Sequence, residues 1–155
     1  MSVTGLKYTI ITSKARVDVD ISRFEGQMER AQMWLGTQVL QDCLPYVPIG
    51  ASGSLRQRSH VDEKGRKVVF PGPYARMQYG GVVMVDSVTG KGPRRIPVGP
   101  GGETIFRYRK GAKLKPSDRP LVYTSPTARA HWFEVAKAEN LDHWLAQASK
   151  LMGGK

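Results

Sequence analysis

Two stretches near the start of the chain alternate apolar and polar residues. The apolar positions are Leu6, Tyr8 and Ile10 in residues 3–12, and Ala15, Val17, Val19 and Ile21 in residues 15–21. A period of two is typical of strands that bury one face. Ser13 and Lys14 would form the turn between them, so residues 3–21 are predicted to be a strand pair.

From Ser22 the apolar positions recur at steps of three and four residues. They are Phe24, Met28, Ala31, Leu35 and Val39, which lie on one face of a helix. We predict a helix over residues 22–44 that ends at Pro45, because the residue before a proline is disfavoured in the α conformation. Gly26 and Gly36 each cost a helix about 1 kcal/mol relative to alanine, and either position would allow a neighbouring segment to come close.

Proline, glycine and serine punctuate residues 45–85. A loop leads to Leu55, which we expect to pack back into the core. The Lys-Gly pair at 64–65 lies between two short apolar runs and predicts a hairpin. Residues 74–79 fit one or two turns of helix before a strand over 82–85. The whole stretch predicts a rigid frame that fixes how the long helix meets the sheet.

Residues 86–119 form the most basic part of the chain. Residues 90–102 contain eight Gly or Pro in thirteen positions, which predicts a loop or a long flexible arm. From Lys91 to Arg119 there are nine Lys or Arg and two Asp or Glu, a balance of +7.

Residues 104–109, TIFRYR, alternate again and predict a strand within this arm. We expect Phe106 and Tyr108 to face the core. Arg107 and Arg109 would then face water and remain available for phosphates.

The last quarter of the chain predicts a helix over 126–152, because Ser125 precedes a proline at the first helical position. One apolar set is Ala128, Trp132, Val135 and Ala136, and the other is Leu141, Trp144, Leu145, Ala148 and Met152. At 100° per residue the two sets lie roughly 160° apart. Either the helix breaks near Glu139 and Asn140, or a continuous helix is apolar on opposite sides at its two ends. We favour the continuous helix, whose second set would contact a neighbouring subunit.

These patterns predict one α+β domain over residues 1–155. A small, mostly antiparallel sheet would be packed by the long helix of the N-terminal half and by the C-terminal helix. A long basic loop or arm would extend from this body.

The net charge of +11 and the isoelectric point of about 10 predict an acidic partner, either nucleic acid or an acidic subunit. The candidate residues for this contact are Lys91, Arg94, Arg95, Arg107, Arg109, Lys110, Lys113 and Lys115.

The sequence offers no candidate catalytic or metal site. Gly90-Lys91-Gly92 lacks the upstream glycine and the hydroxyl of a P-loop, and the three histidines are too far apart for a ligand cluster. The single cysteine, Cys43, is expected to be a small buried hydrophobe. We therefore expect no enzyme and no cofactor.

The first residues resemble no secretory leader, and no apolar run reaches the length of a membrane span.

Four motifs follow one another in a fixed order along the chain. They are Leu40, Pro45, Tyr46, Val47 and Pro48; Ser52, Gly53 and Leu55; Pro73, Tyr74, Ala75, Arg76, Gln78, Tyr79 and Gly81; and Trp132, Phe133, Ala136 and Lys137. Their order and spacing resemble the minor capsid or tail-completion proteins of long-tailed bacteriophages over about residues 20–150. Ser52 replaces the usual threonine, residues 86–119 are longer and more basic than the family pattern, and residues 3–21 lie outside the resemblance.

The resemblance implies a small α+β structural protein of the phage neck, made in the host cytoplasm and joining head to tail. It implies a ring of six or twelve copies around the DNA channel. Other neck, portal-side and tail proteins would be its partners, with non-specific DNA contact in the lumen and no membrane. Its structural frame would be Pro45, Tyr46, Pro48, Gly53, Leu55, Pro73, Tyr74, Gly81 and Trp132. The alternative is a basic nucleic-acid-binding module of a cell or prophage.

Overall fold

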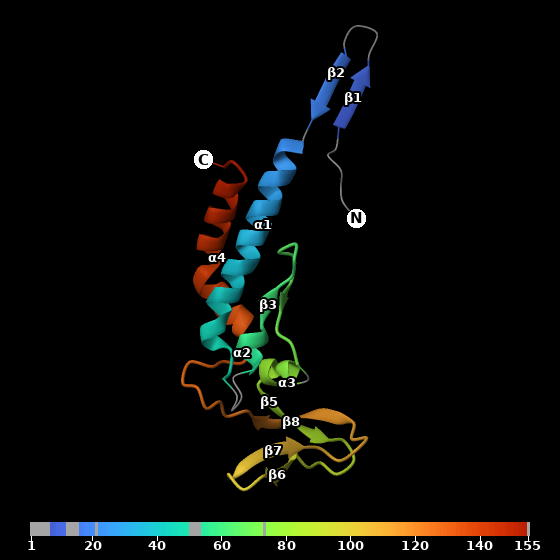
Figure 1. Ribbon diagram of the computed structural model, residues 1–155, viewed down its shortest axis with the longest axis vertical. Coiled ribbons are helices and arrows are strands. Elements are labelled where there is room, and N and C mark those ends of the chain that lie inside the picture. The colour runs from blue at the N-terminus through green and yellow to red at the C-terminus, as the bar shows by residue number, and fades with distance from the viewer. Residues whose placement is uncertain (1–6, 12–15, 21, 50–53, 73, 155) are drawn as a thin grey trace.

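The computed structural model describes residues 7–11, 16–20, 22–49, 54–72 and 74–154. The molecule is elongated, with three parts in a row (Figure 1). Helices α1 (Ser22–Cys43) and α4 (Trp132–Leu151) run antiparallel and side by side in the middle. One strand pair lies beyond the start of α1, and two more lie at the opposite end.

The N-terminal strand pair is confirmed. Strands β1 (Lys7–Ile11) and β2 (Arg16–Asp20) are antiparallel, with Tyr8 opposite Val19. The predicted turn at 13–14 lies outside the described residues.

Helix α1 ends at Cys43, one residue before the predicted end. The chain then tightens into a 3-10 turn, η1 (Leu44–Tyr46), with Pro45 inside it. A proline in the first turn lacks only an N–H that has no helical partner there. The short helix α2 (Ser54–Arg58) follows the loop and was not predicted.

The hairpin at the Lys-Gly turn is confirmed, with β3 (His60–Val61) antiparallel to β4 (Val68–Val69). It lies against α1 at Gly36, where a Cβ would stand 2.8 Å from the carbonyl oxygen of Gly65. Gly65 has a φ of 67°, and a Cβ there would be 2.5 Å from the Cα of Met33. Gly36 therefore permits the close approach that the sequence suggested, whereas a Cβ at Gly26 would meet open space.

Helix α3 (Ala75–Gly80) and strand β5 (Val82–Asp86) agree with the predicted short helix and strand. Gly81 closes α3 in the left-handed conformation, with a φ of 69°. A Cβ on Gly81 would overlap that of Ala130, so this turn requires glycine for two reasons.

The interpretation of residues 90–102 as a loop or flexible arm is wrong. Strand β6 (Arg94–Val98) pairs with β7 (Glu103–Arg107) in a hairpin, and β8 (Leu114–Pro120) pairs with β5. The Gly-rich segment 99–102 is only the turn between β6 and β7. Pairing with residues farther along the chain outweighs the local Gly and Pro content.

The α+β class is confirmed, but the strands do not form one sheet. In the described residues they form four separate antiparallel pairs, namely β1–β2, β3–β4, β5–β8 and β6–β7. Pro116 and Pro120 lie in β8, and proline suits an edge strand because it donates no ladder hydrogen bond. Because each pair has only two strands, each of these strands keeps one edge unpaired among the described residues.

The C-terminal helix begins at Trp132, not at the predicted position 126. Residue His131 precedes it in the left-handed conformation, with a φ of 50°. The backbone amides of Arg129 and His131 donate to the carbonyls of Tyr46 and Tyr79, at 3.0 and 2.9 Å. These distant acceptors hold segment 121–131 in a non-helical path in spite of its helix-start signal.

The core lies where α1, η1 and α4 meet. Its buried residues are Cys43, Val47, Trp132, Ala136 and Trp144, and its half-buried neighbours are Leu35, Val39, Tyr46, Leu55, Phe70 and Tyr79. The rings of Phe70 and Tyr79 pack edge-on against Trp132, with centroids at 5.3 and 4.7 Å. This geometry is favourable for aromatic pairs and ties α4 to the frame. Leu55 packs against the core, as expected.

Candidate interaction surfaces

The loop after α1 is held by hydrogen bonds to its backbone carbonyls. The guanidinium of Arg56 donates to the carbonyls of Val47 and Pro45, at 2.8 and 3.0 Å. The Thr127 hydroxyl also donates to Pro45, at 2.8 Å. Val47 is buried, and a buried carbonyl needs a partner; together the three bonds fix the loop as a frame.

The turn after α3 is held from the same segment, 121–131. The Leu121 amide donates to the Gly81 carbonyl at 2.9 Å, and the Tyr123 hydroxyl donates to the Gln78 carbonyl at 2.6 Å. Burial raises the pKa of the Tyr123 phenol, so the hydroxyl stays a donor. Segment 121–131 thus joins both halves of the frame.

Among the predicted frame residues, Pro48 is buried and Trp132 is at the centre of the core. Tyr74 is 53% exposed at the start of α3. Gly53 and Pro73 lie outside the described residues. The frame therefore positions elements, and its described side chains form no catalytic arrangement.

Two tyrosines connect this frame to carboxylates on α4. The Tyr46 hydroxyl donates to Glu139 at 2.5 Å, and the Tyr79 hydroxyl donates to Glu134. The hydrogen bond from Tyr79 lowers the pKa of Glu134, which keeps that carboxylate ionised. Burial, followed by the hydrogen bond to Glu134, raises the pKa of Tyr79. These contacts leave negative charge on the first turns of α4.

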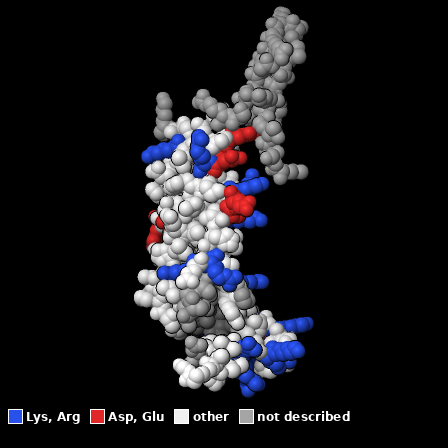
Figure 2. Space-filling model, viewed as in Figure 1, with Lys and Arg blue, Asp and Glu red and all other residues white. Residues whose placement is uncertain are grey.

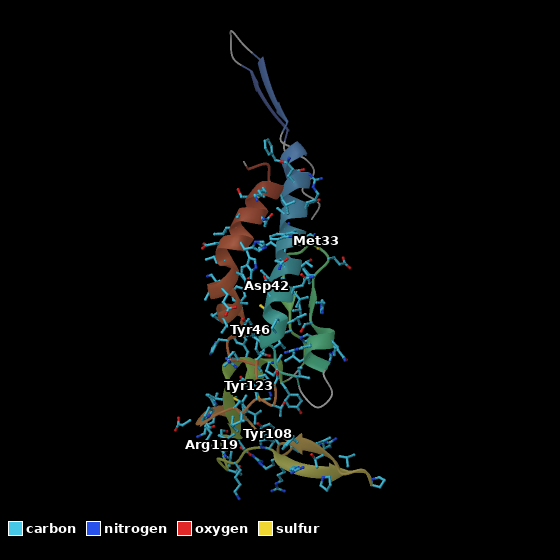
Figure 3. All side chains as sticks on the ribbon, turned by 90° about the vertical axis from the view of Figure 1, so that its left-hand side faces the viewer. Met33, Asp42, Tyr46, Tyr108, Arg119 and Tyr123 are labelled. Carbon is cyan, nitrogen blue, oxygen red and sulfur yellow. The ribbon has the colours of Figure 1, made fainter. Side chains whose placement is uncertain are left out.

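Helix α4 is continuous, as we favoured, but Trp144 is not on an exposed face. Its side chain is 3% exposed, and its indole N–H donates to the Asp42 carboxylate on α1 at 2.6 Å. Figure 3 shows Asp42 in the layer between the two helices. The assignment of Trp144 to a subunit interface is therefore wrong. The two apolar sets diverge because Trp132 faces the frame and Trp144 faces α1.

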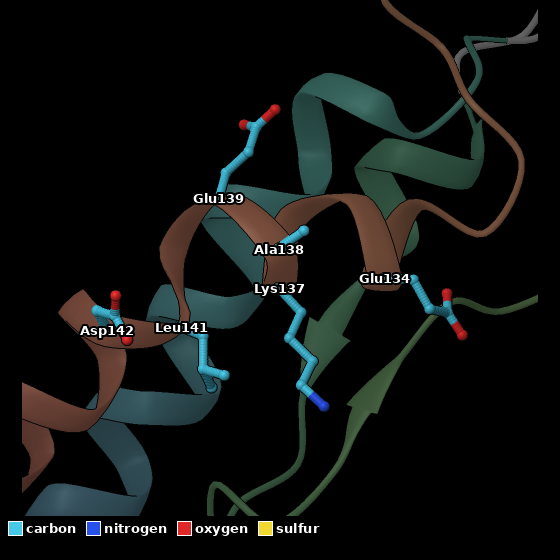
Figure 4. A pocket seen from close by; sticks show the side chains of 6 residues that line it. All are labelled: Glu134, Lys137, Ala138, Glu139, Leu141 and Asp142. Carbon is cyan, nitrogen blue, oxygen red and sulfur yellow. The ribbon is translucent and has the colours of Figure 1, made fainter.

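The opposite side of α4 remains uncovered. Leu141 is 37%, Leu145 is 61% and Met152 is 47% exposed, while Ala148 is half-buried. A shallow hollow on this helix is lined by Glu134, Lys137, Ala138, Glu139, Leu141 and Asp142 (Figure 4). All six come from α4, so the hollow is a surface and encloses no ligand cavity. We call Glu134, Ala138, Leu141, Asp142 and Leu145 the α4 outer face.

Lys and Arg gather at the end of the molecule that carries β6 and β7, whereas the helical part shows both Lys or Arg and Asp or Glu in this view (Figure 2). All eight predicted cations are exposed, namely Lys91, Arg94, Arg95, Arg107, Arg109, Lys110, Lys113 and Lys115. Arg109 is already paired, because its Nε lies 2.9 Å from Asp86 Oδ2. It is therefore the candidate least free to bind a partner.

Asp86, a buried residue of β5, holds the segments next to the β6–β7 hairpin by hydrogen bonds, and this role was not predicted. Its side chain is buried and accepts from the Val88 amide at 2.9 Å as well as from Arg109. These bonds, with the Arg109 guanidinium first, hold the pKa of Asp86 below its usual range. The signal for it in the sequence is an acidic residue that ends an apolar run, VVMVD.

The hairpin β6–β7 exposes apolar side chains together with arginines. Ile96 lies opposite Ile105, and Arg94 lies opposite Arg107. The expectation that Phe106 faces the core is wrong, since it is 56% exposed. Tyr108 is half-buried and its hydroxyl donates to the Met84 carbonyl at 2.9 Å, so this residue ties the chain directly after β7 to the body.

Other site chemistry is limited in the described part of the chain. No group of three or more His, Cys, Asp or Glu residues there is placed to hold a metal ion. Cys43 is buried, and burial raises the pKa of its thiol to about 12, so it is unreactive as a thiolate at neutral pH. None of the described helices combines the length and apolar character that crossing a bilayer requires.

Comparison with protein families gives one match. Residues 12–95 match the family described as "Minor capsid protein", which is more than half of the 155-residue chain. The match includes α1, the frame up to Gly81, and β6 as far as Arg95, and it leaves out β7, β8 and α4. No curated protein and no solved structure matches the chain.

Proposed function

The chain belongs to the minor capsid protein family, and from this premise we propose that it joins head to tail in the neck of a long-tailed bacteriophage. As a minor capsid protein it is a structural component of the virion. In the proposal, copies of the chain form a ring around the DNA channel and contact other neck, portal-side and tail proteins.

The gathering of cations at one end of the elongated molecule is the observation that supports this proposal best. One end carries exposed cations on and beside β6 and β7, and the Asp and Glu side chains seen in Figure 2 lie over the helical part, among further Lys and Arg. A basic end suits the wall of a channel that contains DNA, because phosphates bind Lys and Arg without regard to sequence. The uncovered apolar residues of α4 suit a neighbouring subunit.

Deleting the gene in the phage tests the proposal. We expect particles that separate into DNA-filled heads and free tails, and electron micrographs of complemented particles should show added density at the neck. Complete tailed particles in the deletion strain would contradict a joining role.

The exposed basic end also fits a nucleic-acid-binding module outside the virion. In that case the purified protein should bind duplex DNA with an affinity that falls steeply between 50 and 200 mM salt, on the order of 10³-fold or more for six to ten phosphate contacts. It should also be missing from purified particles. Its recovery from particles in a fixed ratio to the tail proteins would decide for the neck.

A further inference from the structure

The hairpin β6–β7 has the surface composition of a protein interface. Ile96, Val98, Ile105 and Phe106 are 39%, 40%, 37% and 56% exposed on two short strands. The cations on these strands are the arginines 94, 95 and 107, whereas those outside them include Lys91, Lys110, Lys113 and Lys115. Arginine and aromatic residues are enriched in protein interfaces, and lysine is depleted. The hairpin therefore differs from the lysine-rich region next to it.

The register of the hairpin places two arginines side by side, and an anion bound between them would reduce their repulsion. Arg94 lies directly opposite Arg107, and like charges in this position destabilise a strand pair. In the part of the chain that the structure describes, neither arginine forms an ion pair, and the nearby carboxylate of Asp86 is bound to Arg109. An isolated two-stranded hairpin is marginal even without such repulsion. Carboxylates from outside the molecule would remove the penalty.

The α4 outer face offers the complementary surface. Leu141 and Leu145 are exposed apolar groups, and Glu134 and Asp142 add negative charge beside them, against the single positive charge of Lys137. In each surface, apolar side chains lie next to charges, and the signs are opposite. The hairpin lies at one end of the molecule, beyond the β5–β8 pair, whereas α4 lies in the middle (Figure 1), so the two surfaces are apart within one copy.

We propose that the β6–β7 hairpin of one copy docks on the α4 outer face of the next copy. Ile96 and Ile105 cover Leu141 and Leu145, and the paired Arg94 and Arg107 meet carboxylates of the outer face. Such a contact joins two different surfaces, so it propagates from copy to copy and closes into a ring when the rotation between copies permits. This inference rests on the proposed function and specifies the ring contact. It leaves Lys91, Lys110, Lys113 and Lys115 for DNA.

Two variants, each with one of the two surfaces disabled, test whether the contact joins the hairpin of one copy to the α4 outer face of another. The hairpin variant is R94S/I105S/R107S and the outer-face variant is D142R/L145R. Each alone should self-associate at least about 30-fold more weakly than the native chain, the loss expected for interface residues that dominate binding. Mixed in equal amounts, they keep one intact junction and should form a dimer and nothing larger. Sedimentation velocity measures all three samples.

The control variant is K110S/K113S, which loses the same two positive charges outside the hairpin and should assemble like the native chain. Unfolding curves of every variant check that the fold is retained. A mixture that stays monomeric or forms large oligomers would overturn the inference, as would a native chain that remains monomeric at about 1 mM. If the hairpin variant instead loses binding to duplex DNA and the control keeps it, the hairpin binds nucleic acid and the inference fails.

The inference and the proposed function fail separately. A neck ring in the particle whose copies assemble normally with the hairpin variant refutes only the inference. A dimer from the mixed variants, with the protein placed elsewhere in the virion, refutes only the neck role.

Discussion

The core around Trp132 and the hairpin β6–β7 handle their apolar residues in opposite ways. Trp132 is 1% exposed and is enclosed by α1, η1 and the rings of Phe70 and Tyr79. In the hairpin, Phe106 is 56% exposed, and the cross-strand neighbours Ile96 and Ile105 are 39% and 37% exposed. The first region buries its apolar side chains within one chain, and the second leaves apolar side chains exposed to a partner.

The polar groups follow the same division. Around the core, carbonyls of the frame receive donors from Arg56, Thr127 and Arg129, so that few bonds are left for a partner. At the hairpin, the cross-strand pair Arg94–Arg107 has no anion among the described residues. The buried region should therefore determine the stability of the fold, and the exposed region should determine self-association. Substitutions in each region can measure the two effects separately.

Replacing Trp132 by alanine should give the largest change. Removing a fully buried Trp leaves a cavity and should lower the free energy of unfolding by about 4 kcal/mol. The matched change in the other region, Phe106→Ala, removes an exposed ring and should cost less than about 0.5 kcal/mol. Urea denaturation of both variants measures the difference. Equal losses would show that the hairpin is part of the folded core and would remove the contrast.

The contact between Gly65 and α1 should be the next most sensitive feature. Gly65→Ala adds a Cβ 2.5 Å from the Cα of Met33 at a φ of 67°, so overpacking adds to left-handed strain and the cost should be about 3 kcal/mol. Gly90 has nearly the same φ, 68°, with no atom near the new Cβ. Gly90→Ala should therefore cost only about 1 kcal/mol. If thermal unfolding shows the same loss for both, the close approach at α1 has no energetic importance.

The elements that the sequence predicted well depend on local signals. The apolar period from Phe24 to Val39 determines α1, and a Lys-Gly turn determines the β3–β4 hairpin. The order of the motifs that include those around Pro45 and Tyr74 indicated the minor capsid protein family, whose match covers residues 12–95. In each case the residues that specify the element lie within a few positions of one another.

The sequence predictions failed where residues far apart in the chain determine the local structure. Segment 121–131 resembles a helix start, but its donors are held by carbonyls near Tyr46 and Tyr79. Trp144 was assigned to another subunit because hydrophobicity alone does not say which partner covers a residue. Its partner, Asp42, is 102 residues away in the same chain. The pairing of β5 with β8 likewise spans the whole β6–β7 hairpin and has no local signal.

Trp144 offers a direct test of this reassignment. Trp144→Phe keeps most of the buried ring but loses the bond to the Asp42 carboxylate, and hydrogen bonds to charged groups contribute about 1.5–3 kcal/mol. We expect the free energy of unfolding to fall by about 2 kcal/mol. Leu145→Ala, one residue along and 61% exposed, should leave it nearly unchanged and weaken self-association instead. An assembly defect in Trp144→Phe without loss of stability would return Trp144 to the interface.

The ion pair between Asp86 and Arg109 should give the smallest effect, because Arg109 is half exposed and solvent screens the pair. The pKa of Asp86 is lowered in the folded protein. Its contribution to stability is therefore fully present above the unfolded pKa of about 4 and is lost as the pH falls through the folded value. The stability difference between the native chain and Arg109→Gln should be constant from pH 7 to about 5 and should shrink below about 4.

Lys110→Gln removes a neighbouring cation that forms no ion pair with the described residues, and it should show no such dependence. A difference that persists unchanged at about pH 3 would mean that Arg109 stabilises this end by packing and not by charge.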